Sequence, residues 1–184
     1  TDDLSVNLLN ALLQSGRAPN IQQYLVENGV NFVNSFVTNA ICCPSRATLL
    51  RGQYSHNHNV LGIIRTINNG TKVLPGITST GWFPYGGDPG REASTIATWL
   101  QDAGYHTGHI GRYLNGYGIC GPEFVCINRN GEWPAGEPDP RLYIPPGWDN
   151  WQTLIDKSTY KMYNYQMNDN GIIVAYGSGE ADYQ

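Results

Sequence analysis

The sequence predicts an α/β fold in which helices pack on a mostly parallel sheet. Two stretches, residues 19–37 and residues 94–111, support this class, because in each a helical pattern ends at a glycine and a strand pattern follows. Alternation of helices and strands along a chain is typical of such sheets. Twelve Tyr and five Trp among 184 residues supply enough large side chains for a sizeable core.

The first predicted helix covers residues 19–28. Pro19 suits the first helical position, Ile21 and Leu25 share a face, and Gly29 suits the position after the helix. The segment "VNFVNSFV" at residues 30–37 is rich in Val and Phe and therefore predicts a strand.

A second helix is predicted over "SRATLL", after Pro44, and it ends at Gly52. The strongest helical pattern follows at residues 94–103, with Ser94 as the expected N-cap. Its apolar residues recur at helical spacing: Ile96, Trp99, Leu100 and Ala103. Gly104 ends this helix, and "YHTGHIG" at residues 105–111 predicts a short strand.

The rest of the chain is less regular. Residues 65–91 are loop-like, and residues 118–150 form a long excursion rich in Pro, Gly and Trp. Asn170-Gly171 lies between two runs of strand-forming residues and predicts a β-hairpin. We therefore expect a core with the site motifs at 1–117, an irregular loop at 118–150 and a hairpin-containing tail at 151–184.

Charge and hydropathy exclude two classes of partner. The formal net charge is −4, and the eleven Lys and Arg residues form no run, so nonspecific binding to nucleic acid is not expected. No apolar stretch approaches the roughly 20 residues of a membrane span. The N-terminus carries no signal-peptide pattern, although the chain has the look of a piece cut at both ends.

Cysteine usage and one sequon favour a secretory protein weakly. Cys120 and Cys126 bracket a short loop and could form a disulfide or remain two free thiols. Asn69 begins an Asn-Gly-Thr sequence that could accept an N-linked glycan or occur by chance.

The stretch "AICCPSRATLLRG" (residues 40–52) places Cys42 and Cys43 where a helix begins. A helix N-terminus attracts anions, because its first N–H groups have no partner within the helix. A cysteine there is a candidate nucleophile, and the fork of Arg46 suits a tetrahedral oxyanion. The residues thus point to sulfate or phosphate chemistry, or else to small buried residues at a strand–helix junction.

These residues also resemble the type I sulfatase signature, in which the Cys-x-Pro-Ser-Arg cysteine is oxidised to formylglycine. The match makes Cys42 the modified residue and Cys43 the variable one. "GYHTGHIGRYLNGYG" (residues 104–118) resembles the family's second signature, with Arg112 in place of a lysine. "TDDLS" resembles its metal-binding Asp pair. "YIPPGWDNW" and the Tyr-rich tail are similar to the arylsulfatase and N-acetylglucosamine-6-sulfatase branch.

The resemblance implies a partial alkaline-phosphatase-like sandwich and a sulfuric ester hydrolase acting on an aryl sulfate or a sulfated sugar. A hydroxyl of the hydrated aldehyde at Cys42 would attack sulfur and expel the alcohol, and the second hydroxyl would then expel sulfate. Arg46 would hold the formylglycine hydroxyl, and Arg112 would contact a sulfate oxygen. Asn115 could face the substrate or serve only in a turn.

The resemblance also implies partners for the site. Asp2, Asp3 and the modified Cys42 would bind Ca²⁺, with Mg²⁺ less favoured, although an acidic pair at an N-terminus could instead be solvated. A formylglycine-generating enzyme would convert Cys42. The protein would be secreted or lysosomal.

Several features leave other interpretations open. Arg112 is longer than lysine and planar, so it could bind sulfate or clash with it. His56 and His58 are spaced like metal ligands, but without a third ligand nearby a supporting or surface role is favoured. His106 and His109 lie on the strand before Arg112, with no assigned role.

Two other functions compete with sulfate ester hydrolysis. One is a phosphatase or phosphonate hydrolase of the same superfamily. The other is a non-catalytic fragment that binds sulfated ligands, since the family's catalytic domain is longer than this chain and supplies further ligands from its later part. We expect residues 1–184 to be an incomplete N-terminal portion whose independent folding and activity are doubtful.

Overall fold

The computed structural model describes residues 4–62, 89–119, 136, 139–156, 158–161, 163–177 and 179. The chain divides into two compact units, Thr1–Val37 and Thr38–Gln184. In the described residues, no helix is both long and apolar enough to cross a membrane.

The first unit is helical. Helix α1 (Val6–Gln14) begins after Ser5, whose hydroxyl accepts a hydrogen bond of 3.2 Å from the backbone of Leu8. Helix α2 (Pro19–Ile21) starts with proline in its first turn and continues as a π-helix over Gln22–Glu27. The predicted helix at residues 19–28 is therefore confirmed, whereas α1 was not predicted.

The predicted strand at residues 30–37 is wrong. This segment consists of loop and turn residues, and its large side chains face solvent, with Phe36 87% and Val33 82% exposed. A strand is stable only when a neighbour pairs with its backbone N–H and C=O groups. Among the described residues, the single sheet contains no strand from this part of the chain.

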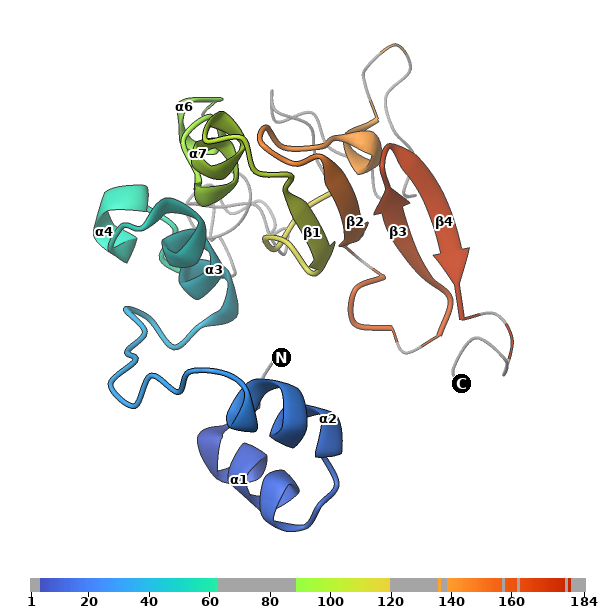
Figure 1. The fold of residues 1–184 in the computed structure, drawn as a ribbon. Coiled ribbons are helices and arrows are strands. Elements are labelled where there is room, and N and C mark those ends of the chain that lie inside the picture. Colours follow the sequence, from blue (N-terminus) through green and yellow to red (C-terminus); the bar gives the residue numbers. More distant parts are fainter. Residues whose placement is uncertain are drawn as a thin grey trace, which may run out of the picture. The chain divides into compact units, whose positions relative to one another are not determined.

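The second unit contains a four-stranded sheet with the order β1-β2-β3-β4 (Figure 1). Its strands are β1 (Gly108–Gly111), β2 (Asn150–Leu154), β3 (Tyr165–Asp169) and β4 (Ile172–Tyr176). β1 and β2 are parallel, whereas β2–β3 and β3–β4 are antiparallel. The α/β class is confirmed, but the described sheet is mixed where a mostly parallel one was expected, because short connections join β2, β3 and β4.

The predicted hairpin is confirmed. Asp169 pairs with Ile172, so β3 and β4 are joined by Asn170 and Gly171 alone. Both joining residues are left-handed, with φ of 51° and 86°. This combination is typical of a type I′ turn, which Asn-Gly favours because both residues tolerate a positive φ.

In the described residues of the second unit, four helices precede the sheet: α3 (Cys42–Arg51), α4 (Ser55–His58), α6 (Pro89–Glu92) and α7 (Ile96–Asp102). The predicted helix at 94–103 is confirmed as α7, but its N-cap is Thr95 and not Ser94. The Thr95 hydroxyl accepts from the backbone of Thr98, and the Thr98 hydroxyl accepts from the backbone of Thr95. This reciprocal capping box explains the shift by one residue.

The core lies between α3 and the first two strands. It joins side chains of α3 and of the segment after α4 to side chains that follow β1 and to those of β2 and its end. The members are Cys43, Ala47, Leu50, Val60, Tyr113, Leu114, Tyr117, Trp151 and Ile155. Trp151 is completely buried, and its indole N–H donates to the Tyr117 hydroxyl at 2.9 Å. The packing fixes α3 against the part of the sheet that carries the second sequence motif.

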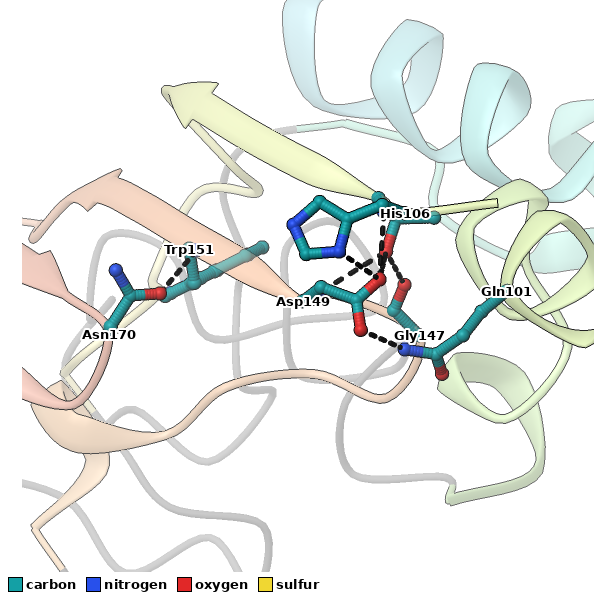
Figure 2. A network of polar contacts seen from close by, with 7 residues as sticks. Gln101, His106, Gly147, Asp149, Trp151 and Asn170 are labelled. Atoms are coloured by element: carbon teal, nitrogen blue, oxygen red, sulfur yellow. Dashed lines mark hydrogen bonds and ion pairs between the residues drawn. The ribbon is translucent and has the colours of Figure 1, made fainter. Parts of the chain in front are cut away.

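Asp149 connects α7, the approach to β1 and the start of β2 (Figure 2). Its carboxylate accepts hydrogen bonds from the backbone N–H of Thr107 at 2.8 Å and from the side chain of Gln101 at 2.9 Å. These bonds, the one to the Thr107 backbone above all, lower the pKa of Asp149. A separate contact in the same view joins the hairpin turn to β2, where Asn170 accepts a hydrogen bond of 2.8 Å from the backbone N–H of Trp151.

Candidate active site

Helix α3 presents its N-terminus without a side-chain cap. Ile41, the residue before the helix, is extended and cannot accept a hydrogen bond through its side chain. At the other end, Gly52 adopts a left-handed conformation with φ of 61° and closes the helix. The first turn of α3 is therefore an electropositive end that begins at Cys42.

The two adjacent cysteines have opposite surroundings. Cys43 is fully buried in the core, and burial raises the pKa of its thiol to about 12. Cys42 is only partly buried, and its Sγ donates weakly to Oδ1 of Asn115 across 3.9 Å. Both are free thiols. Cys42 is thus the reactive candidate and Cys43 is a packing residue.

A pocket of about 340 Å³ lies along α3, one turn from Cys42. Its cationic part is formed by Arg46 and Arg112, and the rest of its lining is apolar or aromatic: Leu49, Leu50, Ile96, His109, Tyr113 and Trp148. None of these side chains is acidic. A pocket with two guanidinium groups and no carboxylate in its wall attracts an anion attached to an apolar or ring-shaped group.

Arg46 and Arg112 approach the pocket from different elements. Arg46 is on α3, four residues after Cys42 and hence on the same helix face. Arg112 follows directly after β1. Nη1 of Arg46 and Nε of Arg112 are buried, so their interaction with an anion would be weakly screened by water.

The charge of Arg112 is maintained despite burial. Burial lowers its pKa, but the hydrogen bond to the Tyr160 hydroxyl and the charges around it act in the opposite direction, and the net shift is upward. Cys42 is among the groups that contribute to this shift.

His109 forms part of the pocket wall and is held in the sheet. Its ring stacks on Trp151, 4.6 Å between centroids, and its Nδ1 lies 2.7 Å from Oγ1 of Thr153. Burial lowers the pKa of His109 to about 4. The imidazole is consequently neutral near pH 7 and contributes a polar edge without adding charge.

The other histidines take no part in the pocket. His58 is buried, accepts a hydrogen bond from the Val60 backbone through Nδ1, and contacts the Thr48 hydroxyl at 3.0 Å through Nε2. His56 stacks on Tyr54, and His106 is exposed beside Asp149 at 3.6 Å. His58 thus supports the packing around α4, and His56 is exposed at the surface.

Several predicted site residues lie outside the described part of the chain. They are the metal-ligand candidates Asp2 and Asp3, the glycosylation candidate Asn69, and the possible disulfide pair Cys120 and Cys126. Within the residues that the structure describes, no group of three or more His, Cys, Asp or Glu could hold a metal ion. The described residues that come together are Cys42, Arg46, Arg112 and Asn115.

Sequence reasoning missed the aromatic part of the site. Trp148 and Tyr113 line the pocket, and Tyr160 contacts Arg112. Trp148 and Tyr160 are far from both cysteines in the sequence, and only sheet pairing brings their segments near Arg112. The Trp-rich "PPGWDNW" stretch was a usable signal, because tryptophan in an otherwise irregular segment indicates a packed one.

An electropositive helix end, a partly exposed cysteine beside it and two convergent arginines are typical of enzymes that act on tetrahedral oxyanion esters. Residues 1–170 match the protein family described as Sulfatase. The chain belongs to the sulfatase family.

Individual relatives agree with the family assignment. The chain is 37% identical over 166 residues to a putative extracellular sulfatase Sulf-1 homolog of Caenorhabditis elegans, covering 90% of this chain and 18% of that protein. It is 35% identical to the extracellular sulfatase SULF-1 homolog of Drosophila melanogaster, covering 96% of this chain and 12% of that protein. It is 32% identical to the human N-acetylglucosamine-6-sulfatase, covering 79% of this chain and 21% of that protein.

The chain thus spans between 12% and 21% of the length of these relatives. No solved structure gives a significant match.

Proposed function

We propose that the protein hydrolyses sulfate monoesters and that Cys42, after conversion to formylglycine, supplies the nucleophile. The observation that carries the proposal is the position of Cys42 at the uncapped start of α3, one turn from Arg46 and near Arg112. Family membership supports the same chemistry. The hydrated aldehyde would provide the attacking oxygen and a route for releasing sulfate.

The residues of the chain would act mainly through electrostatics. The negative charge of the sulfate group would lie between the Arg46 and Arg112 guanidinium groups and near the start of α3. Asn115, whose side chain faces Cys42, would orient the converted residue through its amide. The alcohol part of the substrate would contact the apolar and aromatic wall that continues along α3 past Arg46.

We further propose that Asp2 and Asp3 bind a divalent cation, most favourably Ca²⁺. Carboxylate oxygens are the ligands that this ion prefers, and a bound cation would supply additional positive charge toward the sulfate oxygens. The described residues do not by themselves form a metal site, so the cation would depend on the Asp pair and on ligands beyond the described part.

The substrate and the compartment are also proposals. Relatives named as extracellular sulfatases and as N-acetylglucosamine-6-sulfatase support a secreted or lysosomal protein that acts on a sulfated sugar. An aryl sulfate suits the pocket wall equally well. A formylglycine-generating enzyme is the expected partner during maturation.

The test compares 4-nitrophenyl sulfate with 4-nitrophenyl phosphate, using the complete protein made in cells that contain the converting enzyme. The proposal expects the sulfate ester to react much faster, and Cys42→Ala to remove the activity. Faster reaction of the phosphate ester would identify a phosphatase. No reaction with either ester would support a non-catalytic, ligand-binding role.

A further inference from the structure

Arg112 makes two contacts with one aromatic side chain, Tyr160. Nη2 of Arg112 donates a hydrogen bond to the Tyr160 hydroxyl, and Cζ of the guanidinium lies 4.4 Å from the centre of the Tyr160 ring. The first contact fixes one end of the guanidinium and the second fixes its distance from the ring. Together they restrict the orientation of a side chain that otherwise has several rotatable bonds.

Tyr160 lies in the connection between β2 and β3, and this connection is internally braced. Asp156 accepts hydrogen bonds from the backbone of Gly116 and, at 2.8 Å, from the Thr159 hydroxyl. The buried hydroxyl of Ser158 donates to the backbone at the end of β2, also at 2.8 Å. Because Gly116 follows shortly after Arg112, Asp156 ties the segment that carries Tyr160 to the segment that carries the arginine.

The guanidinium of Arg112 faces the pocket as well as Tyr160, since Arg112 is one of the residues that line the pocket. The sulfatase signature has a lysine at this position. A lysine presents a compact charge that any nearby oxygen can approach, whereas an arginine binds well only when its planar fork is correctly turned. An arginine here therefore needs a neighbour that sets the plane of the fork.

We propose that Tyr160 is a positioning residue that holds the Arg112 guanidinium in place to contact the sulfate group. This pairing lets arginine serve where the signature carries lysine. The inference rests on the proposed function, because it assigns Arg112 to the sulfate. The electrostatic environment is consistent with it, since contact with Tyr160 raises the pKa of Arg112 against the opposing effect of burial.

A double-mutant cycle in the complete protein tests the pairing. Tyr160→Leu removes both the ring and the hydroxyl, and Arg112→Lys removes the fork but retains the charge. With Arg112 present, Tyr160→Leu is expected to lower kcat/KM for 4-nitrophenyl sulfate about fivefold. With lysine at position 112, the same change is expected to have an effect below about twofold, since lysine needs no orientation.

Two further variants separate positioning from general damage. Tyr160→Phe keeps the ring and loses the hydroxyl, so its kcat/KM should fall between those of the wild type and Tyr160→Leu. Tyr163→Leu is the matched control, because Tyr163 lies in the same connection and is similarly exposed, 64% against 69% for Tyr160. Its kcat/KM should remain that of the wild type.

Binding of inorganic sulfate, measured by calorimetry, distinguishes failure of this inference from failure of the proposed function. The inference expects Tyr160→Leu to weaken sulfate binding with Arg112 present but not with lysine there, even if no ester is hydrolysed. Equal effects of Tyr160→Leu in the two backgrounds would overturn the pairing while leaving the sulfatase proposal intact. Absence of sulfate binding by the wild type would also overturn it.

Discussion

At the scale of single residues, the candidate site depends on the different burial of two adjacent cysteines, Cys42 and Cys43. Cys42 is partly exposed beside Asn115, whereas Cys43 is buried with its thiol pKa raised to about 12. One position along a helix turns a side chain by about 100°, which is enough to move a thiol from the site into the core. Under the proposed function, the doubled cysteine therefore combines one functional residue, Cys42, with one structural residue, Cys43.

Paired substitutions test this division of roles. Cys42→Ala should abolish sulfate ester hydrolysis with little effect on stability, because Cys42 is outside the core cluster. Cys43→Ala should retain activity but lose about 1 kcal/mol of stability, because it leaves a small cavity. Activity assays and urea unfolding of the two variants check the prediction. Full activity in Cys42→Ala would contradict it.

His109 should make the free energy of unfolding decrease as pH falls below 7. Its pKa is lowered to about 4 in the folded protein, while an unfolded histidine titrates near 6.5. Between these values the unfolded state binds more protons, so the contribution of His109 to stability is lost as pH falls. From pH 7 to pH 5 the loss should be about 2 kcal/mol.

The measurement is urea unfolding of the wild type and of His109→Gln at pH 7 and pH 5. The variant should lose less stability than the wild type over this interval, by about the same 2 kcal/mol. His58 also has a lowered pKa because of burial, and it is present in both proteins, so its contribution cancels. Equal pH dependence of the two proteins would show that His109 titrates normally.

At the scale of elements, the segment before β2 can pack closely against α7 because it has a glycine, Gly147, at the point of contact. This residue has a φ of 90°, and a Cβ there would lie 2.5 Å from the backbone nitrogen of Thr98. Gly171 in the hairpin has a similar φ of 86° but open space around it. Both glycines therefore require a positive φ, but only Gly147 also lies against another part of the backbone, that of α7.

Alanine at each position measures the two effects separately. Gly171→Ala should cost about 1 to 2 kcal/mol from backbone strain alone. Gly147→Ala should cost about 3 kcal/mol or more, because overpacking against the α7 backbone is added. Thermal unfolding of both variants gives the comparison. Equal losses would mean that the segment before β2 moves away from α7 at little cost.

Local chemistry determined which elements the sequence could predict. The helix after Cys42 and the Asn170-Gly171 hairpin were predictable, because Gly52, Asn170 and Gly171 impose their backbone conformations on their own. The strand at 30–37 was not, since a Val- and Phe-rich segment forms a strand only beside a partner. The N-cap is Thr95 and not Ser94, because Thr95 and Thr98 form two reciprocal hydrogen bonds between side chain and backbone.

At the scale of the whole molecule, the site combines a local motif with distant segments. Cys42 and Arg46 are four residues apart, and Arg112 lies in a second recognisable motif, so these residues could be proposed as site residues from the sequence. Trp148 and Tyr160 reach the same region only because β2 pairs with β1. Parallel pairing across a connection of this length leaves no periodic pattern from which it could be predicted.

The exposed segment at residues 30–37 gives a prediction at this scale. Phe36→Ser should change the free energy of unfolding by no more than about 0.5 kcal/mol, because Phe36 is 87% exposed. Trp151→Ala, in the core, should cost about 3 to 5 kcal/mol. Urea unfolding compares them. A cost for Phe36→Ser near that of Trp151→Ala would show that Phe36 is buried and would favour the strand that the sequence pattern predicted.

If Cys42 is the nucleophile in the proposed way, it must be converted to formylglycine, and the mass of the peptide that contains it shows whether this happens. The protein should be produced in cells that contain a formylglycine-generating enzyme and then digested for mass spectrometry. The Cys42 thiol should be replaced by an aldehyde, while Cys43 should remain a thiol. An unmodified Cys42 from such cells would contradict it.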